Sequence, residues 1–473
     1  MAIDIDPAMP LFHFQHGQVL VALKQWEEAI KSFRKTHELQ PTSALPLLLW
    51  ADACTQLDKC DEAMRLFKQA REIENIVEVD EHEGLCLLQM GNIPEAEQLF
   101  DRVIERRPDY HWGYIHKGKL LMERKQHADA EACFVKAMKL NTKAHEALYL
   151  LALLHEHRGQ ADIAIRYAIQ AIQVSPKAWP CHILLGNLLL AQNQLEAAQQ
   201  VLQQAHELEP DNAYTLELLV SALRRQHKLA EALVPVDKFL ALQPDNAVMR
   251  HFRAMLRGDN VDTAPKEYVS GLFDGYADRF DHHLQQVLSY KTPEQLAWSL
   301  RMLPGIQAML PMSLLDLGCG TGLGAQALQG MTSVRVGVDL SEKMIEKARF
   351  KQLYSELHSL DIIEFMTGCD RTFDLVVATD VLGYIGNLSP FFKAVRNVMA
   401  AQGLLAFSIE KEEGTASFHL HPNGRYTHAP EYILKLAEEE GYVLVKQENI
   451  VVRMENYLPV HGLIYILKKA KIH

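Results

Sequence analysis

The stretch Ser313-Leu-Leu-Asp-Leu-Gly-Cys-Gly-Thr-Gly322 decides how the second half of this chain folds. An apolar run ends at Asp316, three glycines follow at alternate positions, and helix-forming residues begin at Leu323. This order predicts a buried strand, a tight turn and the start of a helix. Glycine permits positive φ angles and a close approach of the backbone to a ligand, and a helix start leaves N–H groups free. We therefore expect a nucleotide-like ligand at this turn.

Two acidic residues at strand ends narrow the choice of ligand. Asp316 ends the first strand, and Asp339 ends the next apolar run, residues 334–338. The dinucleotide pattern G-x-G-x-x-G fits poorly, since Leu323 stands where the third glycine is expected. A carboxylate beside the turn would repel a pyrophosphate but attract ammonium and sulfonium groups, and Asp339 can accept from both ribose hydroxyls. The pattern favours S-adenosylmethionine (SAM); the alternative is a Rossmann-like sheet whose turn binds another ligand or none.

Length and composition predict two globular domains in a reducing compartment. The 473 residues exceed what one core usually serves, and the formal net charge of −12 argues against a nucleic-acid partner. The seven cysteines are scattered without a C-x-x-C pair, which indicates free thiols. The first six residues show no signal-peptide pattern, and no apolar run approaches the roughly 20 residues that span a bilayer. We expect a cytoplasmic protein without membrane contact.

Residues 10–246 repeat with a period of 34 residues and one register slip near residue 76, the signature of tetratricopeptide repeats (TPRs). The predicted solenoid spans residues 10–258. A small residue recurs in each period, and in most periods a bulky one follows four positions later, as in Ala29 and Phe33. Glycines stand where two helices would cross closely, at Gly17, Gly84, Gly118 and Gly186. About seven helix pairs are expected, with residues 248–258 as a closing helix.

Such a solenoid presents a concave groove, so we expect a protein or peptide partner there. The alternative is a spacer or a self-association surface. The side chains expected to face the groove are mixed in chemistry and do not identify the ligand; they include Glu78, Glu81, Trp112, Tyr149, Asn187, Tyr214 and Glu217.

A polar segment with Gly and Pro, residues 257–265, marks the expected boundary, and the second domain would occupy residues 262–473. Phe273, Tyr276 and Phe280 follow at helical spacing. They predict a helix within residues 265–300 that covers the pocket as a lid, with Tyr276 beside the ligand and Arg279 offered to its carboxylate. The alternative is that these aromatic residues only anchor the helix on the sheet.

Five stretches carry a resemblance to bacterial TPR-containing class I methyltransferases: residues 268–281, 315–322, 337–344, 373–386 and 424–428. The resemblance implies an all-α TPR solenoid followed by an α/β, Rossmann-like domain. Its sheet would have seven strands in the order 3-2-1-4-5-7-6, with one strand reversed. After the first two strands, the sequence accommodates the others at residues 355–359, 373–377, 404–409, 442–449 and 463–467.

The resemblance also assigns the cofactor pocket for SAM. Asp316 would lie near the methionine ammonium, with Gly318 and Gly320 as the backbone floor, and Asp339 would bind the ribose. The adenine would be flanked or bonded by Leu340, Met344, Asp361 and Ile362, and Asp380 would end strand 4 where the methyl acceptor approaches. Two of these have plainer alternatives: Met344 as core and Asp361 as a helix N-cap.

Three residues are candidates for catalysis. His428 and Tyr384 could act as a base if the acceptor carries a proton, and Arg425 could orient an acidic acceptor. His428 could instead cap the following helix. Strand 4 ends in Asp380-Val-Leu-Gly and not in Asn/Asp-Pro-Pro-Tyr, which disfavours adenine or glutamine acceptors. The pair His419-x-His421 lacks further ligands, so we expect no metal.

The sequence thus predicts a SAM-dependent methyltransferase whose TPR array recruits a protein or a protein-tethered acceptor. One alternative is a small-metabolite methyltransferase whose TPRs serve assembly only. The other is a scaffold that binds SAM without catalysis.

Overall fold

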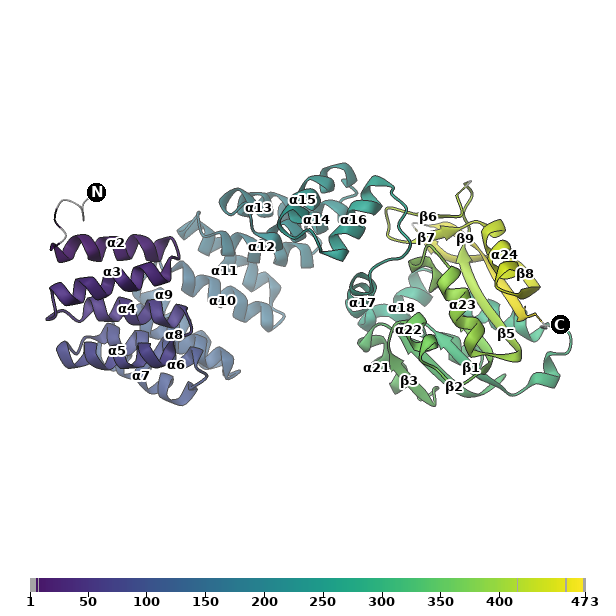
Figure 1. Ribbon diagram of the computed structural model, residues 1–473, viewed down its shortest axis with the longest axis horizontal. Helices are drawn as coiled ribbons and strands as arrows, with labels where there is room; N and C mark the ends of the chain where they lie inside the picture. Colours follow the sequence, from purple (N-terminus) through teal and green to yellow (C-terminus); the bar gives the residue numbers. More distant parts are fainter. Residues whose placement is uncertain (1–5, 7, 415, 456, 471–473) are drawn as a thin grey trace. The chain divides into compact units, whose positions relative to one another are not determined.

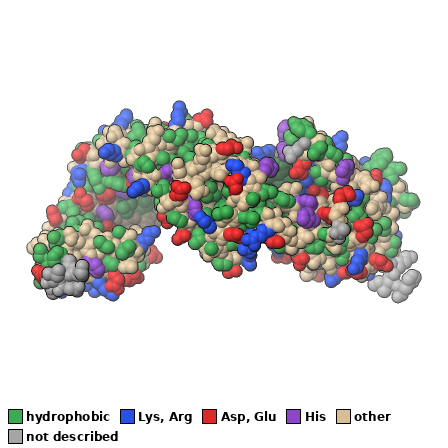
Figure 2. Space-filling model, turned by 90° about the horizontal axis from the view of Figure 1, so that it is seen from above, with side chains coloured by type: hydrophobic (Ala, Val, Ile, Leu, Met, Phe, Trp, Pro, Cys, Tyr) green, Lys and Arg blue, Asp and Glu red, His purple; other side chains and the backbone are tan. Residues whose placement is uncertain are grey.

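The chain divides into two units, Met1–Gln226 and His227–His473, in the computed structural model. The structure describes residues 6, 8–414, 416–455 and 457–470 (Figure 1). Residues 1–5, which bear on the absence of a signal peptide, lie outside the described residues. No helix in the described part of the chain has the length and apolar character needed to cross a bilayer. On the face drawn in Figure 2, basic and acidic side chains intermingle.

Antiparallel helices fill the first unit, as the repeat pattern predicts (Figure 1). In order they are α2 (Pro10–Ala22), α3 (Trp26–Leu39), α4 (Leu45–Gln56), α5 (Cys60–Ile73), α6 (Val77–Gln89), α7 (Ile93–Arg106), α8 (His111–Glu123), α9 (His127–Leu140), α10 (His145–His157), α11 (Ala161–Val174), α12 (Trp179–Ala191), α13 (Leu195–Leu208) and α14 (Ala213–Arg225). With α15 (Leu229–Leu242) and the closing helix α16 (Ala247–Arg257), which belong to the second unit, these helices match the predicted seven repeats.

The predicted glycine and bulky residues meet inside each helix pair. A Cβ atom placed on Gly17 would lie 2.6 Å from the Phe33 ring, and one on Gly84 would lie 2.7 Å from the Phe100 ring. Phe33 and Phe100 are fully buried. The paired helices therefore cross at a distance that only glycine allows.

Charged residues tie neighbouring repeats together. Asp80 is fully buried and accepts hydrogen bonds from Arg71, Arg102 and Arg106, at 2.9 to 3.0 Å. Such a buried carboxylate is tolerated only because it is paired. Glu81, expected in the groove, is also buried and accepts from Tyr110 at 2.8 Å and bonds His116 at 2.9 Å. That expectation was wrong for Glu81, which serves the packing of the repeats.

The second unit holds the sheet. After α15 and α16 its elements are α17 (Lys266–Asp274), η1 (Ala277–Arg279), α18 (Phe280–His282), η2 (His283–Val287), α19 (Thr292–Arg301), η3 (Ile306–Met309), β1 (Met312–Leu317), α20 (Leu323–Ala327), β2 (Thr332–Asp339), α21 (Glu342–Phe350), β3 (Glu356–Ser359), α22 (Ile362–Thr367), β4 (Phe373–Ala378), η4 (Leu382–Tyr384), α23 (Ser389–Val398), β5 (Met399–Glu410), β6 (Phe418–Leu420), β7 (Tyr426–His428), α24 (Pro430–Glu439), β8 (Tyr442–Glu455) and β9 (Leu458–Lys469).

The described strands form a seven-stranded sheet in the order β3-β2-β1-β4-β5-β9-β8, and β6 and β7 form a separate hairpin. When the hairpin is left out of the count, this is the predicted order 3-2-1-4-5-7-6. β1 to β5 pair in parallel, and β9 runs antiparallel to both of its neighbours. One core packs α22, α23 and α24 on one face of the sheet, and a second packs α19 and α20 on the other. The sheet is thus covered on both faces, which explains its apolar strands.

The predicted lid helix needs correction, and the two compact units meet inside the predicted solenoid. Residues 265–300 do not form one helix but α17, three short turns and α19. The units divide between residues 226 and 227, not near residues 258–262. The reason is that α16 packs on the β6–β7 hairpin through Met255, which is fully buried with Leu420 and Tyr426. Tyr268 of α17 completes this cluster, which we call the junction cluster (Ala254, Met255, Ala264, Tyr268, Leu420 and Tyr426).

Candidate active site

The glycine turn after β1 forms the centre of the site. Gly318, Gly320 and Gly322 have φ angles of 63°, 52° and 95°. A Cβ atom on Gly318 would collide with a methyl group of Val381, which follows β4. β1 and β4 are neighbours in the sheet, so their carboxyl ends bring these residues together. The turn therefore needs glycine both for its backbone angle and for its contact.

Asp339 holds the turn in place. Its Oδ2 accepts from the Gly320 N–H at 2.8 Å, and its Oδ1 accepts from the Ser341 N–H at 2.9 Å. Burial raises the pKa of Asp339, while these two hydrogen bonds act in the opposite direction. Each carboxylate oxygen keeps a second lone pair for a further hydrogen bond, and the binding of ribose hydroxyls by Asp339 stays a prediction.

Asp316 lies behind the turn and is not part of the cavity wall. It is almost fully buried, and its Oδ2 accepts from the Tyr354 hydroxyl at 2.7 Å. Burial raises the pKa of Asp316 to about 7, and the bond from Tyr354 works against that rise. Direct contact with a ligand ammonium therefore stays a prediction for Asp316, and Tyr354 is a partner that the sequence analysis missed.

The predicted adenine side is assembled in part. Leu340, Asp361 and Ile362 line the cavity. Asp361 is also the N-cap of α22, where its Oδ1 accepts from Ile363 and Glu364 at 3.0 Å, so the plainer alternative holds as well. Met344 is fully buried and is absent from the cavity wall, so it belongs to the core and not to the pocket.

The segment before the sheet, residues 266–288, covers the cavity, and we call it the covering segment. Phe273, Tyr276 and Phe280 all line it, and Phe280 also packs against the core around α19. The segment is tied down by Asp281, which accepts from Thr321 in the turn and from Lys351 at 2.7 Å. These residues thus act as a cover and as an anchor. Arg279 is exposed and lies outside the wall, 5.9 Å from the Tyr276 ring centroid, so the structure does not bring it to the pocket.

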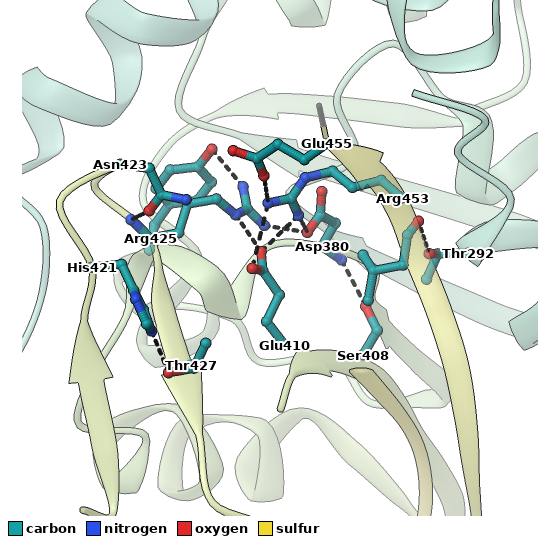
Figure 3. Close-up of polar contacts among 12 residues, drawn as sticks. Thr292, Asp380, Ser408, Glu410, His421, Asn423, Arg425, Thr427, Arg453 and Glu455 are labelled. Atoms are coloured by element: carbon teal, nitrogen blue, oxygen red, sulfur yellow. Dashed lines mark hydrogen bonds and ion pairs between the residues drawn. The ribbon is translucent and has the colours of Figure 1, made fainter. Parts of the chain in front are cut away.

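A network of buried charges forms the far end of the cavity (Figure 3). Arg425 donates to Asp380, to Glu410 and, at 2.8 Å, to the Tyr384 hydroxyl. Arg453 donates to Glu410 at 2.7 Å and to Glu455 at 3.0 Å. The two arginines lower the pKa of Glu410 to about 2 against the effect of burial, so it stays ionised.

Asp380 has an unusual backbone. It adopts a φ of 59°, and its N–H donates to Ser408 Oγ at 2.9 Å. A left-handed conformation at a residue other than glycine costs energy and is often kept at functional sites. The network fixes Asp380 at the end of β4, as the prediction for that residue required.

His428 does not reach the cavity. Its Nε2 lies 2.8 Å from the Ile385 carbonyl oxygen and 3.2 Å from that of Gly386, and the side chain is fully buried. Burial lowers the pKa of His428 to about 4. The proposal of His428 as the base is therefore corrected: its ring supports the loop after β4. Tyr384 and Arg425 do line the cavity, but each is already bonded within the network.

The cavity has a volume of about 610 Å³, within the range of small-molecule sites. The glycine turn, Asp339 and Ile362 line one side, and Asp380, Arg425 and Arg453 line the other. The side-chain-free turn and the buried carboxylate of Asp339 fit a nucleoside. No cluster of His, Cys, Asp and Glu suited to a metal occurs among the described residues.

Comparison with protein families agrees with this geometry. Residues 315–407 match a family described as a methyltransferase domain. Residues 82–110, 116–180 and 156–219 match families described as tetratricopeptide repeats. The chain joins tetratricopeptide repeats to a class I methyltransferase domain.

Each of the similar proteins matches only part of the chain. The human mitochondrial import receptor subunit TOM70 is 28% identical over 174 residues, which are 35% of this chain and 29% of the receptor. The malonyl-[acyl-carrier protein] O-methyltransferase of Legionella pneumophila is 38% identical over 149 residues, 30% of this chain and 49% of the enzyme. The chain thus spans about half the length of this enzyme and less than a third of the length of the receptor.

A solved structure, the SAM-bound magnesium protoporphyrin IX methyltransferase of Synechocystis, aligns with 43% of this chain and 97% of its own. The TM-score is 0.34 and the identity 16%.

Two residues of the methyltransferase domain were missed by the sequence analysis. Glu410 ends an apolar run just as Asp316 and Asp339 do, and this signal could have identified it. Arg453 interrupts an otherwise apolar stretch of β8, but the predicted strand stopped at residue 449. An arginine inside a buried strand is rare unless paired, and that rule could have flagged it.

Proposed function

We propose that this protein transfers a methyl group from SAM and that its TPR array recruits a protein partner or a protein-tethered acceptor. The observation that carries the proposal is the glycine turn, braced by Asp339, that opens into a cavity of about 610 Å³. The methyltransferase family match over residues 315–407 supports it. The likeness to an enzyme named for a carrier-protein substrate supports the tethered acceptor.

The residues of the cavity would divide the work. Gly318 and Gly320 let the cofactor approach the backbone, Asp339 holds the ribose, and Ile362 presents its N–H to the adenine. When bound, SAM supplies a methyl group that is already activated on a positively charged sulfur. Positioning then provides much of the rate, and the covering segment with Tyr276 excludes water.

Calorimetry tests the cofactor. The purified full chain should release heat on titration with SAM and with S-adenosylhomocysteine, and Asp339→Ala should weaken both by at least about tenfold, as expected when a charged hydrogen-bond acceptor is lost. NAD and ATP are the comparison ligands. Tight binding of either one without binding of SAM would refute the proposal.

Labelled cofactor tests recruitment. The full chain would be incubated with methyl-labelled SAM and a cell lysate, and protein and small-molecule fractions would be counted separately. We expect label on a protein or on a group attached to one. Label in small molecules alone, at an equal rate for residues 227–473 and for the full chain, would favour the small-metabolite alternative. Binding of SAM without any labelled product would favour the scaffold.

A further inference from the structure

The wall of the cavity beyond the cofactor side holds two guanidinium groups. Arg425, Arg453 and Asp380 line it at this end (Figure 3). Glu410, which balances the arginines, is buried beneath them and is not part of the lining. A ligand at this end therefore meets two guanidinium groups and one carboxylate that is already engaged.

The two guanidinium groups are held in fixed positions. Glu410 bonds both of them, Tyr384 accepts from Arg425, and Asp380 lies 3.9 Å from Arg453. Arginine keeps its charge at every physiological pH, and its planar fork matches a carboxylate. Held in this way, the two guanidinium groups would repel a protonated amine. A neutral hydroxyl would gain little from their charge, whereas an anion would form charge-assisted hydrogen bonds with them.

Glu455 pairs with Arg453 from outside the described lining of the cavity. Its carboxylate accepts from Arg453 at 3.0 Å, and its side chain is 42% exposed, whereas those of Glu410 and Arg453 are 7% exposed. It is therefore the partner of Arg453 that an incoming anion can replace at the lowest cost. Replacement of one carboxylate by another leaves the net charge of the network unchanged.

The rest of this end is apolar. Phe273, Leu284, Leu288 and Tyr290 line it, the first three from the covering segment. These side chains leave room for an aliphatic or aromatic body attached to the anion.

The described lining contains no histidine. His428 is buried against backbone carbonyl groups, and the Nδ1 of His283 is bonded to the hydroxyl of Tyr276, which lines the cavity. Burial raises the pKa of Tyr276 to about 12 and also raises that of Tyr384, so both phenols stay protonated. Asp380 accepts from Arg425. An acceptor atom that arrives without a proton needs none of these groups.

We propose that the acceptor is a carboxylate on an apolar body and that a carboxylate oxygen takes the methyl group. This inference rests on the function proposed above. The oxygen forms a bond to the methyl carbon while the carbon–sulfur bond breaks and its electron pair stays on sulfur. The carboxylate loses its negative charge as the sulfonium loses its positive charge, so a neutral ester and a neutral thioether result, and no proton moves.

Three probes of equal length test the class of acceptor. Hexanoate, 1-hexanol and hexylamine would be titrated into the full chain saturated with S-adenosylhomocysteine, and each would be incubated with SAM to measure methyl products by mass spectrometry. We expect hexanoate to bind at least about tenfold more tightly than hexanol, the effect of one charge-assisted interaction, and methyl hexanoate to be the product. Equal or tighter binding of hexanol or hexylamine would overturn the inference.

Two variants should change hexanoate binding in opposite directions, so misfolding cannot produce both results. Glu455→Gln should tighten hexanoate binding about threefold because it frees an N–H group of Arg453, and Arg453→Gln should abolish the preference for hexanoate over hexanol. Arg371→Gln is the control: this arginine pairs with Glu356 at the surface, outside the cavity, and its loss should change neither. A preference that survives Arg453→Gln, or one that Glu455→Gln weakens, would contradict the proposal.

The parallel titration with S-adenosylhomocysteine separates the two levels of failure. If it does not bind, the proposed function fails. If it binds and the methyl group appears on the alcohol or the amine, only the carboxylate inference fails.

Discussion

At the scale of single residues, the site depends on contacts between neighbouring strand ends. Gly318 follows β1 and Val381 follows the neighbouring strand β4. Val381 leaves no room for a side chain on Gly318. Asp380, beside Val381, keeps a left-handed backbone that Ser408 and Arg425 hold in place. Rigid placement of this kind fixes the two ends of the cavity relative to each other.

Gly318→Ala should weaken SAM binding by at least about tenfold, because the new methyl group strains a positive φ and displaces Val381. Calorimetry with S-adenosylhomocysteine would measure the change. Gly330→Ala is the matched control, since Gly330 has open space around its Cβ position and no positive φ. Equal losses in the two variants would show that the turn tolerates a side chain.

His428 makes the stability of the protein depend on pH. Burial lowers its pKa from the usual 6.5 to about 4 in the folded chain. Above pH 6.5 the ring is neutral in both states and has no effect. Below pH 6.5 the unfolded chain takes up a proton that the folded chain refuses, so stability falls, by up to roughly 3 kcal/mol at pH 4.

His428→Gln should therefore flatten the pH dependence of unfolding between pH 6.5 and 4 while keeping a donor for the Ile385 carbonyl group. Urea unfolding at several pH values would compare the variant with the parent chain, and the difference between the two curves isolates this residue. Parallel curves would show that the ring accepts a proton while the chain is folded.

At the scale of elements, the repeats and the strands were predictable because their signals are long. Seven periods of small and bulky residues define the helix pairs, and apolar runs that end in Asp316 and Asp339 define β1 and β2. The β6–β7 hairpin was missed, since strands of three residues show no alternation to recognise. The covering segment was predicted as one helix because its aromatic spacing is helical, but α17 ends at Asp274 and shorter turns follow.

Gly118 and Phe134 allow a test of helix crossing within one repeat. The Phe134 ring occupies the place of a Cβ atom on Gly118, so Gly118→Ala should destabilise the first unit by about 1–3 kcal/mol through overpacking. Phe134→Leu makes room, and the double variant should be more stable than the sum of the single effects predicts, by at least about 0.5 kcal/mol. Urea unfolding followed by circular dichroism would measure the coupling. Simple additivity would mean that the helices separate to admit the methyl group.

At the scale of the whole molecule, the boundary of the repeats in sequence differs from the boundary in structure. The period of the sequence continues through α15, and a polar segment after α16 suggested a linker. Contacts instead place both helices in the unit that carries the sheet. Sequence patterns reveal which residues are buried, but they do not reveal what those residues pack against. Met255, for example, packs against residues 420–426, which are distant in the sequence.

Two shortened chains test this division. Residues 227–473 should unfold at a higher temperature than residues 262–473, because the shorter chain lacks Met255 and exposes Leu420 and Tyr426. Loss of one buried side chain of this size costs about 2 kcal/mol, or roughly 4–8 °C for a domain of this length. Differential scanning calorimetry would compare them. A shorter chain that is equally stable would restore the boundary near residue 260.

The junction cluster has a consequence for how such a protein can change over evolutionary time. The turn that carries Arg425 also contains Gly424, which lies against the Tyr268 hydroxyl and beside Met255. An exchange of repeat arrays between related genes would therefore have to keep α16 with the unit that carries the sheet, or the recombinant would lose the packing that supports the turn of Arg425, a residue of the cavity wall. The repeats before α15 contribute none of the described residues of this cluster, so their exchange would leave it intact.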